Sequence, residues 1–313
     1  MRPLFVRSSF VSCAAFVLML VGVLNAAEPI KKVLYLGIDG TRFDAIEKAN
    51  TPNLDGLIAD GIYSPTCLIL SERYRKNDTV SGPGWSSILT GVWADKHGVH
   101  NNTFVGSNYP EFPHFFARLK ETRPAARTVS LVTWKPIHEK IVSAADVTRN
   151  YEGTEKGPKA YEIGDAKATD DAVQELTEGN PDVLFLYVGQ VDETGHAFGF
   201  HPAVPEYVTA IERADGLVGR ALTAMKGRMT FAQEDWLVVV TSDHGGKGKG
   251  HGGGHNDPDI LNSFLIVSGP AAQRGRFEEQ VFLVDAPVTV LAHLGVSAKP
   301  EWKLDGRPVG LKK

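Results

Sequence analysis

The sequence predicts an α/β protein with a doubly wound, mostly parallel sheet, helices on both faces, and a single domain. Short apolar runs alternate along the chain with longer stretches of helical pattern, which is the order of parallel strands joined by crossover helices. The apolar runs are continuous, as in strands that helices cover on both faces. No repeat, low-complexity tract or linker divides the sequence. We therefore expect one layered domain.

The individual elements follow this alternation in chain order. The apolar runs that predict strands are VLYLGI at 33–38, TVSLVT at 128–133, VLFLYVGQV at 183–191, WLVVVT at 236–241 and FLIV at 264–267. Helical patterns occupy residues 52–59, 85–90, 168–176, 204–225 and 286–294. Residues 103–126 and 148–164 fit neither pattern, and we expect loops there, over the sheet edge.

Composition and charge exclude two broad classes of protein. The chain has 33 Lys and Arg residues against 37 Asp and Glu residues, for a net charge of −4. A dedicated nucleic-acid binder would usually carry a strongly basic face. Hydrophobic residues make up 42% and charged residues 22%, which excludes wholesale disorder.

The N-terminal segment, residues 1–26, has the layout of a secretory signal peptide. Arg2 and Arg7 precede an apolar run, and Ala26 and Ala27 supply small residues at its end. The alternative is an uncleaved membrane anchor, but the run at 11–24 is shorter than the ~20 residues that span a bilayer. We therefore expect an exported, periplasmic or secreted protein with no stable membrane anchor and a catalytic domain at 27–313. Its remaining cysteine, Cys67, is expected to be a small buried residue.

Acidic and imidazole side chains follow three of the predicted strands. Asp39 follows the first strand, Asp192 and His196 follow 183–191, and Asp243 and His244 follow 236–241. Ligands of open parallel sheets gather beyond the carboxyl ends of the strands. A single Asp at such a place is usually a helix cap or a turn residue. Three such strand ends, two of them with a nearby His, favour a metal site.

The ligand types and spacings favour two metal ions. Asp and His suit Zn²⁺ well, and Mn²⁺ or Fe more weakly. One ion is expected between Asp39, Asp243 and His244. A second, about 4 Å away, is expected between Asp192, His196 and either His251 or His255. The Gly-rich stretch at 249–255 is alternatively a mobile surface loop.

A nucleophile for such a site is offered by Ser81. It stands two residues before Pro83, which suits the first turn of a helix. Its hydroxyl would project from a helix N-terminus, where a phosphoryl anion is favoured, and a bound cation would deprotonate it. The alternative is that Ser81 merely caps the helix.

Taken together, these motifs resemble the alkaline phosphatase superfamily, and within it the type I phosphodiesterase/nucleotide pyrophosphatase branch. The resemblance covers about 33–309. It rests on motifs in a specific order: Gly37-Ile38-Asp39-Gly40, Ser81-x-Pro83, Leu89-Thr90-Gly91, His97-Gly98, Asp192-x-x-x-His196, Ser242-Asp243-His244-Gly245, Asp285-Ala286-Pro287 and Asp305-Gly306-Arg307-Pro308.

The resemblance implies a role for each site residue. The ion held by Asp39, Asp243 and His244 would also bind and activate Ser81, and the other ion would face the leaving group. Ser81 stands where the branch commonly has Thr, which implies a covalent phospho-serine intermediate. Asn102 stands where the branch has an Asn that hydrogen-bonds a phosphoryl oxygen. His251 fits the Gly-His-Gly-Gly pattern of bacterial relatives, whereas His255 has the better spacing from Ser268-Gly269-Pro270, and we favour His251.

The expected substrate is a small phosphorylated molecule. Four hypotheses for the function remain open. A phosphodiesterase/nucleotide pyrophosphatase is expected first and an alkaline phosphomonoesterase second. A sulfatase is disfavoured because Trp85 stands where sulfatases of the superfamily carry Arg. The fourth hypothesis is a binding protein that keeps the metals and only holds its ligand. Trp85, Phe104 and Trp134 either stack on a base or belong to the core.

Overall fold

The computed structural model describes residues 28–71, 75–142 and 144–313, so the expected signal peptide lies outside the described residues. Eight strands form one sheet in the order β4-β3-β5-β1-β6-β7-β2-β8. The strands are β1 (Ile30–Ile38), β2 (Gly61–Leu68), β3 (Thr128–Val132), β4 (Val147–Asn150), β5 (Val183–Val188), β6 (Glu234–Thr241), β7 (Asn262–Ser268) and β8 (Gly275–Arg276). Strands β4, β3, β5, β1 and β6 run parallel, whereas β7 is antiparallel to both β6 and β2. The expected doubly wound, mostly parallel sheet is thus confirmed.

Ten α-helices and three short helical segments connect the strands within the described residues. The α-helices are α1 (Phe43–Ile46), α2 (Pro52–Asp60), α3 (Ser81–Thr90), α4 (Ala94–His97), α5 (Phe115–Thr122), α6 (Pro158–Thr177), α7 (Gln190–Phe198), α8 (Pro205–Lys226), α9 (Pro258–Leu261) and α10 (Asp285–His293). The shorter segments are η1 (Ile137–Ile141), η2 (Phe231–Gln233) and η3 (Pro300–Trp302). In none of the described helices are length and apolar character sufficient to cross a membrane.

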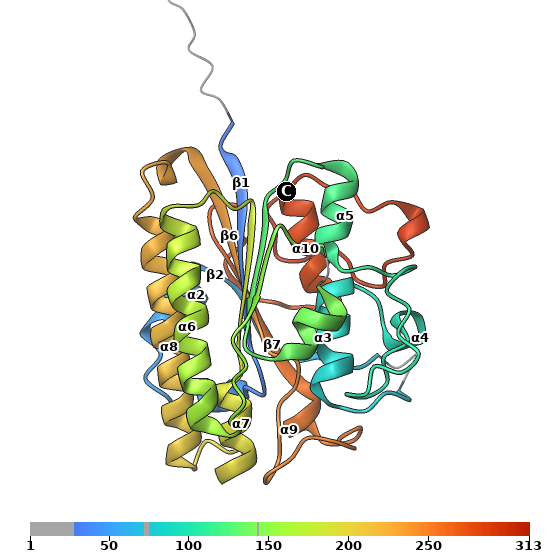
Figure 1. Ribbon diagram of the computed structural model, residues 1–313, viewed down its shortest axis with the longest axis vertical. Coiled ribbons are helices and arrows are strands. Elements are labelled where there is room, and N and C mark those ends of the chain that lie inside the picture. The colour runs from blue at the N-terminus through green and yellow to red at the C-terminus, as the bar shows by residue number, and fades with distance from the viewer. Residues whose placement is uncertain (1–27, 72–74, 143) are drawn as a thin grey trace, which may run out of the picture.

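The sheet lies between two helical layers (Figure 1). Helices α2, α6 and α8 cover one face, and α3, α5 and α10 cover the other. Successive side chains of β1 enter different cores: Val33 and Tyr35 pack on the α3 side, Leu34 and Leu36 on the α8 side. Because the strands are buried on both faces, their sequences are continuous apolar runs. Cys67 is buried in the α3-side core, as expected.

All five predicted strands are present with bounds that differ by a few residues, and the largest overextension is at the end of one strand. The run 183–191 predicts a strand throughout, but β5 ends at Val188, and Gln190 begins α7. The backbone N–H groups of Gly189 and Gln190 donate to the Asp165 carboxylate, 3.0 and 2.9 Å away, which stabilises the start of the helix. The apolar pattern of the sequence continues through this change from strand to helix and therefore does not reveal it.

The two stretches expected to be loops contain regular structure, so that expectation was wrong in part. Helix α5 lies within 103–126 and buries Phe115, Phe116 and Leu119 against the α3-side core. The second stretch contains most of β4 and the first turns of α6, which starts at Pro158. Helix α5 was missed because eight residues are too few to show a helical period, and β4 with the start of α6 because few of their residues are apolar.

Strand register places the site. Ile38 of β1 pairs with Val188 of β5, and Gly37 pairs with Thr241 of β6. The three parallel strands therefore end at the same level, and the residues that follow them meet at one edge of the sheet. Helices α7 and α9 lie at this lower end of the sheet in Figure 1.

Candidate active site

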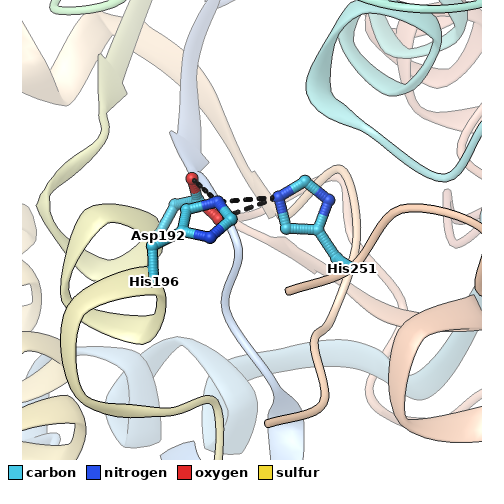
Figure 2. A group of neighbouring side chains, drawn as sticks. All are labelled: Asp192, His196 and His251. Atoms are coloured by element: carbon cyan, nitrogen blue, oxygen red, sulfur yellow. Dashed lines mark hydrogen bonds and ion pairs between the residues drawn. The ribbon is translucent and has the colours of Figure 1, made fainter. Parts of the chain in front are cut away.

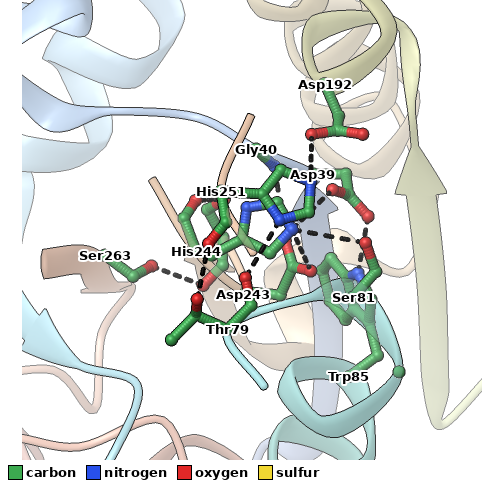
Figure 3. Close-up of polar contacts among 12 residues, drawn as sticks. Asp39, Gly40, Thr79, Ser81, Trp85, Asp192, Asp243, His244, His251 and Ser263 are labelled. Atoms are coloured by element: carbon green, nitrogen blue, oxygen red, sulfur yellow. Dashed lines mark hydrogen bonds and ion pairs between the residues drawn. The ribbon is translucent and has the colours of Figure 1, made fainter. Parts of the chain in front are cut away.

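The first group of predicted ligands converges beyond β1 and β6. Asp39 follows β1, and Asp243 and His244 follow β6; all three are buried. The Nε2 atom of His244 lies 3.2 Å from Asp243 Oδ2 and 3.6 Å from Asp39 Oδ1. Figure 3 shows the three side chains directed toward one another. The Nε2 atom of His244 thus lies near both carboxylates, and donors of these types bind Zn²⁺.

Glycine allows the surrounding backbone to approach this group. Gly40 has φ +62°, and a Cβ atom there would lie 2.5 Å from Asp192 Oδ1. A Cβ atom at Gly84 of α3 would lie 2.8 Å from Asp243 Cβ. A larger residue at position 40 would displace Asp192 of α7, and one at position 84 would push α3 away from Asp243.

The second group of predicted ligands joins α7 to the Gly-rich loop. Asp192 and His196 lie one turn apart on α7, with His196 Nε2 3.3 Å from Asp192 Oδ2. His251 Nε2 lies 3.5 Å from Asp192 Oδ1 and 3.0 Å from His196 Nε2 (Figure 2). The ligand atoms of Asp39, Asp192 and His244 also lie within 4.8 Å of one another. Asp192 is therefore within reach of both groups.

His255 lies apart from the cluster. Its Nε2 atom is 2.7 Å from the backbone carbonyl of Asn77. Of the two candidates for the late ligand, the structure brings His251 to the other donors and directs His255 elsewhere.

The three clustered imidazoles share one orientation. Each presents Nδ1 to a backbone carbonyl: Gly245 for His244 at 2.9 Å, Lys249 for His196 at 3.0 Å, and Thr79 for His251 at 2.9 Å. If Nδ1 carries the proton, Nε2 keeps its lone pair for a cation, the arrangement typical of metal-binding histidines. In that tautomer the Nε2 atoms are the ones available to a cation.

Buried carboxylates give the site an excess of negative charge. Burial, and next the charge of Asp192, raise the pKa of Asp39 to about 6. Burial, and next the charges of Asp39 and Asp192, raise the pKa of Asp243 well above its ordinary value. One buried oxygen of each of the three carboxylates has no hydrogen-bond partner within the described chain. These oxygens fit a divalent cation, which would bind them and offset their repulsion.

The charge of the second group is shared between Asp192 and its histidines. Burial acts to raise the pKa of Asp192, but the hydrogen bond from His196, and next the charge of His244, outweigh it and lower the pKa. The same hydrogen bond raises the pKa of His196 to about 9. Burial, and next the charge of His244, lower the pKa of His251 to about 3, which keeps its imidazole neutral. A neutral imidazole is the form that binds metals.

Ser81 and Asn102 lie beside these groups. Ser81 is the first residue of α3, with Val80 at the N-cap, and its Oγ atom lies 3.3 Å from His244 Nε2. The structure therefore does not support a capping role for Ser81. Asn102 Oδ1 accepts a hydrogen bond from the backbone N–H of Gly82 at 2.7 Å, which leaves the amide NH₂ of Asn102 as a donor. Both residues line a cavity of about 390 Å³ next to the cluster.

The aromatic residues weighed for base stacking have different places. Trp85 is fully buried, and its indole N–H donates to Asp39 Oδ2 at 2.7 Å, so it belongs to the core. Phe104 is buried with its ring centroid 6.0 Å from that of Trp134, and Trp134 lines the cavity. Sequence reasoning missed Tyr187, whose hydroxyl donates to Asp39 Oδ2 at 2.6 Å. A tyrosine near the end of a buried strand, where its hydroxyl requires a partner, was the available signal.

The fold and the arrangement of the site define an alkaline phosphatase-like protein. The family model described as type I phosphodiesterase/nucleotide pyrophosphatase matches residues 33–265. The chain belongs to this family. The match includes every clustered residue described above.

Two human relatives have similar sequences. Bis(5'-adenosyl)-triphosphatase ENPP4 of Homo sapiens is 26% identical over 235 residues, which cover 68% of this chain and 47% of the relative. Ectonucleotide pyrophosphatase/phosphodiesterase family member 7 of Homo sapiens is 24% identical over 239 residues, with the same two coverages. The chain thus spans about half the length of the curated relatives it matches.

Solved structures share the fold. Murine ectonucleotide pyrophosphatase/phosphodiesterase 5 has a TM-score of 0.64 and 15% identity, covering 86% of this chain and 96% of that one. BT1596, a 2-O GAG sulfatase, has a TM-score of 0.68 and 13% identity, covering 90% and 73%. At these identities the likeness concerns the fold alone.

Proposed function

We propose that this protein is an exported, periplasmic or secreted phosphodiesterase/nucleotide pyrophosphatase that holds two divalent metal ions and acts through a phospho-serine intermediate on Ser81. The observation that carries the proposal is the position of Ser81 Oγ, 3.3 Å from His244 Nε2 and open to the cavity beside the cluster. Membership of the family supports it. Residues 1–26 are proposed to be a signal peptide that is removed, with 27–313 as the catalytic domain.

The donor set supports two ions, with zinc as the preferred metal and Mn or Fe as alternatives. Asp39, Asp243 and His244 would hold the ion next to Ser81. Asp192, His196 and His251 would hold the other. When bound, the two ions would lower the pKa of the Ser81 hydroxyl and offset the charge of the phosphoryl oxygens.

The residues of the chain then divide the chemistry between them. Ser81 Oγ attacks phosphorus in line with the departing alcohol, so that a Ser81 O–P bond forms as the ester O–P bond breaks. The amide NH₂ of Asn102 donates to a phosphoryl oxygen and stabilises its charge. Water then attacks phosphorus from the opposite side, which releases the phosphate product and frees Ser81. The hydrogen bonds of Trp85 and Tyr187 hold the Asp39 carboxylate in place throughout.

The test is a comparison of four nitrophenyl substrates on purified protein of known metal content. These are a phosphomonoester, bis-nitrophenyl phosphate, a nucleotide-type diester and a sulfate, each with and without chelator. We expect chelator-sensitive activity with preference for the diesters. Preference for the monoester would assign the protein to the phosphatases instead. Lack of activity on all four with both ions bound would overturn the proposal in favour of a binding protein.

A further inference from the structure

Glu193 places an additional acidic group in the wall of the active-site cavity. It lies on the first turn of α7, next to Asp192, and lines the cavity together with Ser81 and Asn102. Its side chain is partly exposed, and within the described residues no hydrogen bond or ion pair engages its carboxylate. The side chain is therefore available to a ligand.

Outside the cluster of predicted ligands, whose His196 acts electrostatically on Glu193, no positive side chain of the described residues lines the cavity with this carboxylate. Among the described residues, neither lysine nor arginine lines the cavity. The charge of Lys156 acts on Glu193, but the Lys156 ammonium is paired with Glu152. Lys249 contributes its backbone carbonyl to His196, and the residue is exposed outside the cavity lining. Beyond the cluster, the charge of the cavity wall is therefore negative.

Three aromatic residues also form part of the wall. Trp134, Tyr161 and Tyr187 line the cavity, and the Tyr161 ring covers the backbone of Gly189, where a Cβ atom would lie 2.6 Å from it. Aromatic faces attract cations and accept apolar groups, whereas they repel anions. The Glu193 carboxylate and the aromatic rings thus both favour a cationic or apolar group over an anion in the cavity.

We propose that Glu193 is a specificity-determining residue that makes this cavity select phosphate esters whose organic group is neutral or cationic and disfavour esters with additional negative charge. The inference rests on the proposed function and narrows its substrate class. A phosphoryl group itself faces the cluster and Asn102. A second phosphate or a carboxylate on the substrate, in contrast, would lie against Glu193 with no lysine or arginine to bind it. Of the two proposed activities, the inference therefore retains the phosphodiesterase and disfavours cleavage of nucleoside polyphosphates.

A series of three diesters of similar size tests the proposal. Each is a nitrophenyl phosphodiester, and the second ester group is trimethylammonioethyl, 3,3-dimethylbutyl or carboxypropyl. We expect kcat/KM to fall in that order, by about five- to tenfold between neighbours, because one charge acts at several ångströms in a partly screened site. The differences are expected in KM, since the charge lies away from phosphorus.

Variants assign the selectivity to one carboxylate. Glu193→Gln keeps the shape and removes the charge, and is expected to bring the three kcat/KM values within about twofold of one another. Glu193→Asp keeps the charge and is expected to preserve the order. Glu206→Gln on α8 makes the same change in net charge at an exposed residue outside the cavity and should leave the order intact. Equal rates in the unmodified protein, or an unchanged order in Glu193→Gln, would overturn the proposal.

A binding measurement separates this proposal from the proposed function. Metal-loaded Ser81→Ala protein is titrated calorimetrically with the three alkyl phosphates that carry the same organic groups. If the unmodified protein hydrolyses no diester, the proposed function fails. The same order of Kd values would still support charge selection by Glu193, and equal Kd values would refute it.

Discussion

The Nε2 atoms of His251 and His196 lie 3.0 Å apart, although the two residues are 55 positions apart in the chain. Two unprotonated ring nitrogens would repel each other at that distance, so a proton or a metal ion must lie between them. The Nδ1 atoms are both directed to backbone carbonyls, which holds the two Nε2 atoms in this position. The pair therefore marks a place where proton and metal compete.

Replacement of His251 by Ala is expected to reduce the metal content from about two ions per chain to about one, because the second group loses one of three ligands. His255→Ala is the matched control: it comes from the same loop, and its Nε2 atom lies against Asn77. Metal content is measured by mass spectrometry after dialysis. Loss of an ion in His255→Ala, with His251→Ala unaffected, would reverse the assignment.

Replacement of Ser81 by Ala is expected to reduce diester turnover by on the order of 10³-fold or more and to leave two ions bound, because only the nucleophile is removed. Ser87→Ala is the control. It removes a buried hydroxyl from the same helix, but this hydroxyl lies 3.1 Å from His97 Nε2 and does not contact the cluster. That variant should retain turnover. Normal turnover in Ser81→Ala would exclude a phospho-serine intermediate.

The parts of the site that adjoin strands were predictable, because a polar residue directly after a buried strand is visible in the sequence. Asp39 and Asp243 are of this kind. The resemblance favoured His251 over His255 but left both open, since the choice depends on the path of a Gly-rich loop that has no periodicity. Asp165 gave no signal at all, because an Asp inside a helix does not reveal which distant backbone groups it meets.

Asp165 positions the helix that carries Asp192 and His196. It is buried on α6 and accepts hydrogen bonds from Gly189 N and Gln190 N at the start of α7. In Asp165→Asn an NH₂ group replaces the second oxygen and faces a backbone donor. We expect the apparent metal affinity to fall by about 10- to 100-fold, with a loss of about 1–3 kcal/mol in unfolding free energy.

A control for this prediction is Asp215→Asn. Asp215 is also buried, and it accepts hydrogen bonds from the backbone N–H groups of Asn53 and Leu54 at the start of α2. Helix α2 carries no residue of the cluster, so this variant should lose a similar amount of stability and keep its metal affinity. Equal metal affinity in the two variants would show that Asp165 is purely structural. Metal titrations and urea unfolding provide the two readouts.

The stabilisation gained on metal binding is expected to increase with pH. The pKa of Asp39 in the fold is about 6, above its ordinary 3.8, so the metal-free protein loses stability as pH rises between these values. The pKa of His196 is about 9, above its ordinary 6.5. The contribution of His196 to the free energy of unfolding of the metal-free protein is therefore fully present below pH 6.5 and is lost as pH rises to about 9. A metal ion requires both groups without their protons, so protons compete with it less as pH rises.

The difference in Tm between zinc-loaded and metal-free protein should therefore increase from pH 5 to pH 9, more steeply below about 6, where both groups give up a proton to the metal, than between 6 and 9, where only His196 does. Thermal unfolding at constant free zinc measures it. Asp39→Asn, which has no carboxyl to titrate, should lose the steeper rise below about 6 and keep the rise up to about 9, even though it binds zinc more weakly. The same Tm difference at every pH would mean that neither Asp39 nor His196 gives up a proton when the metal binds, and would remove both from the ligand set.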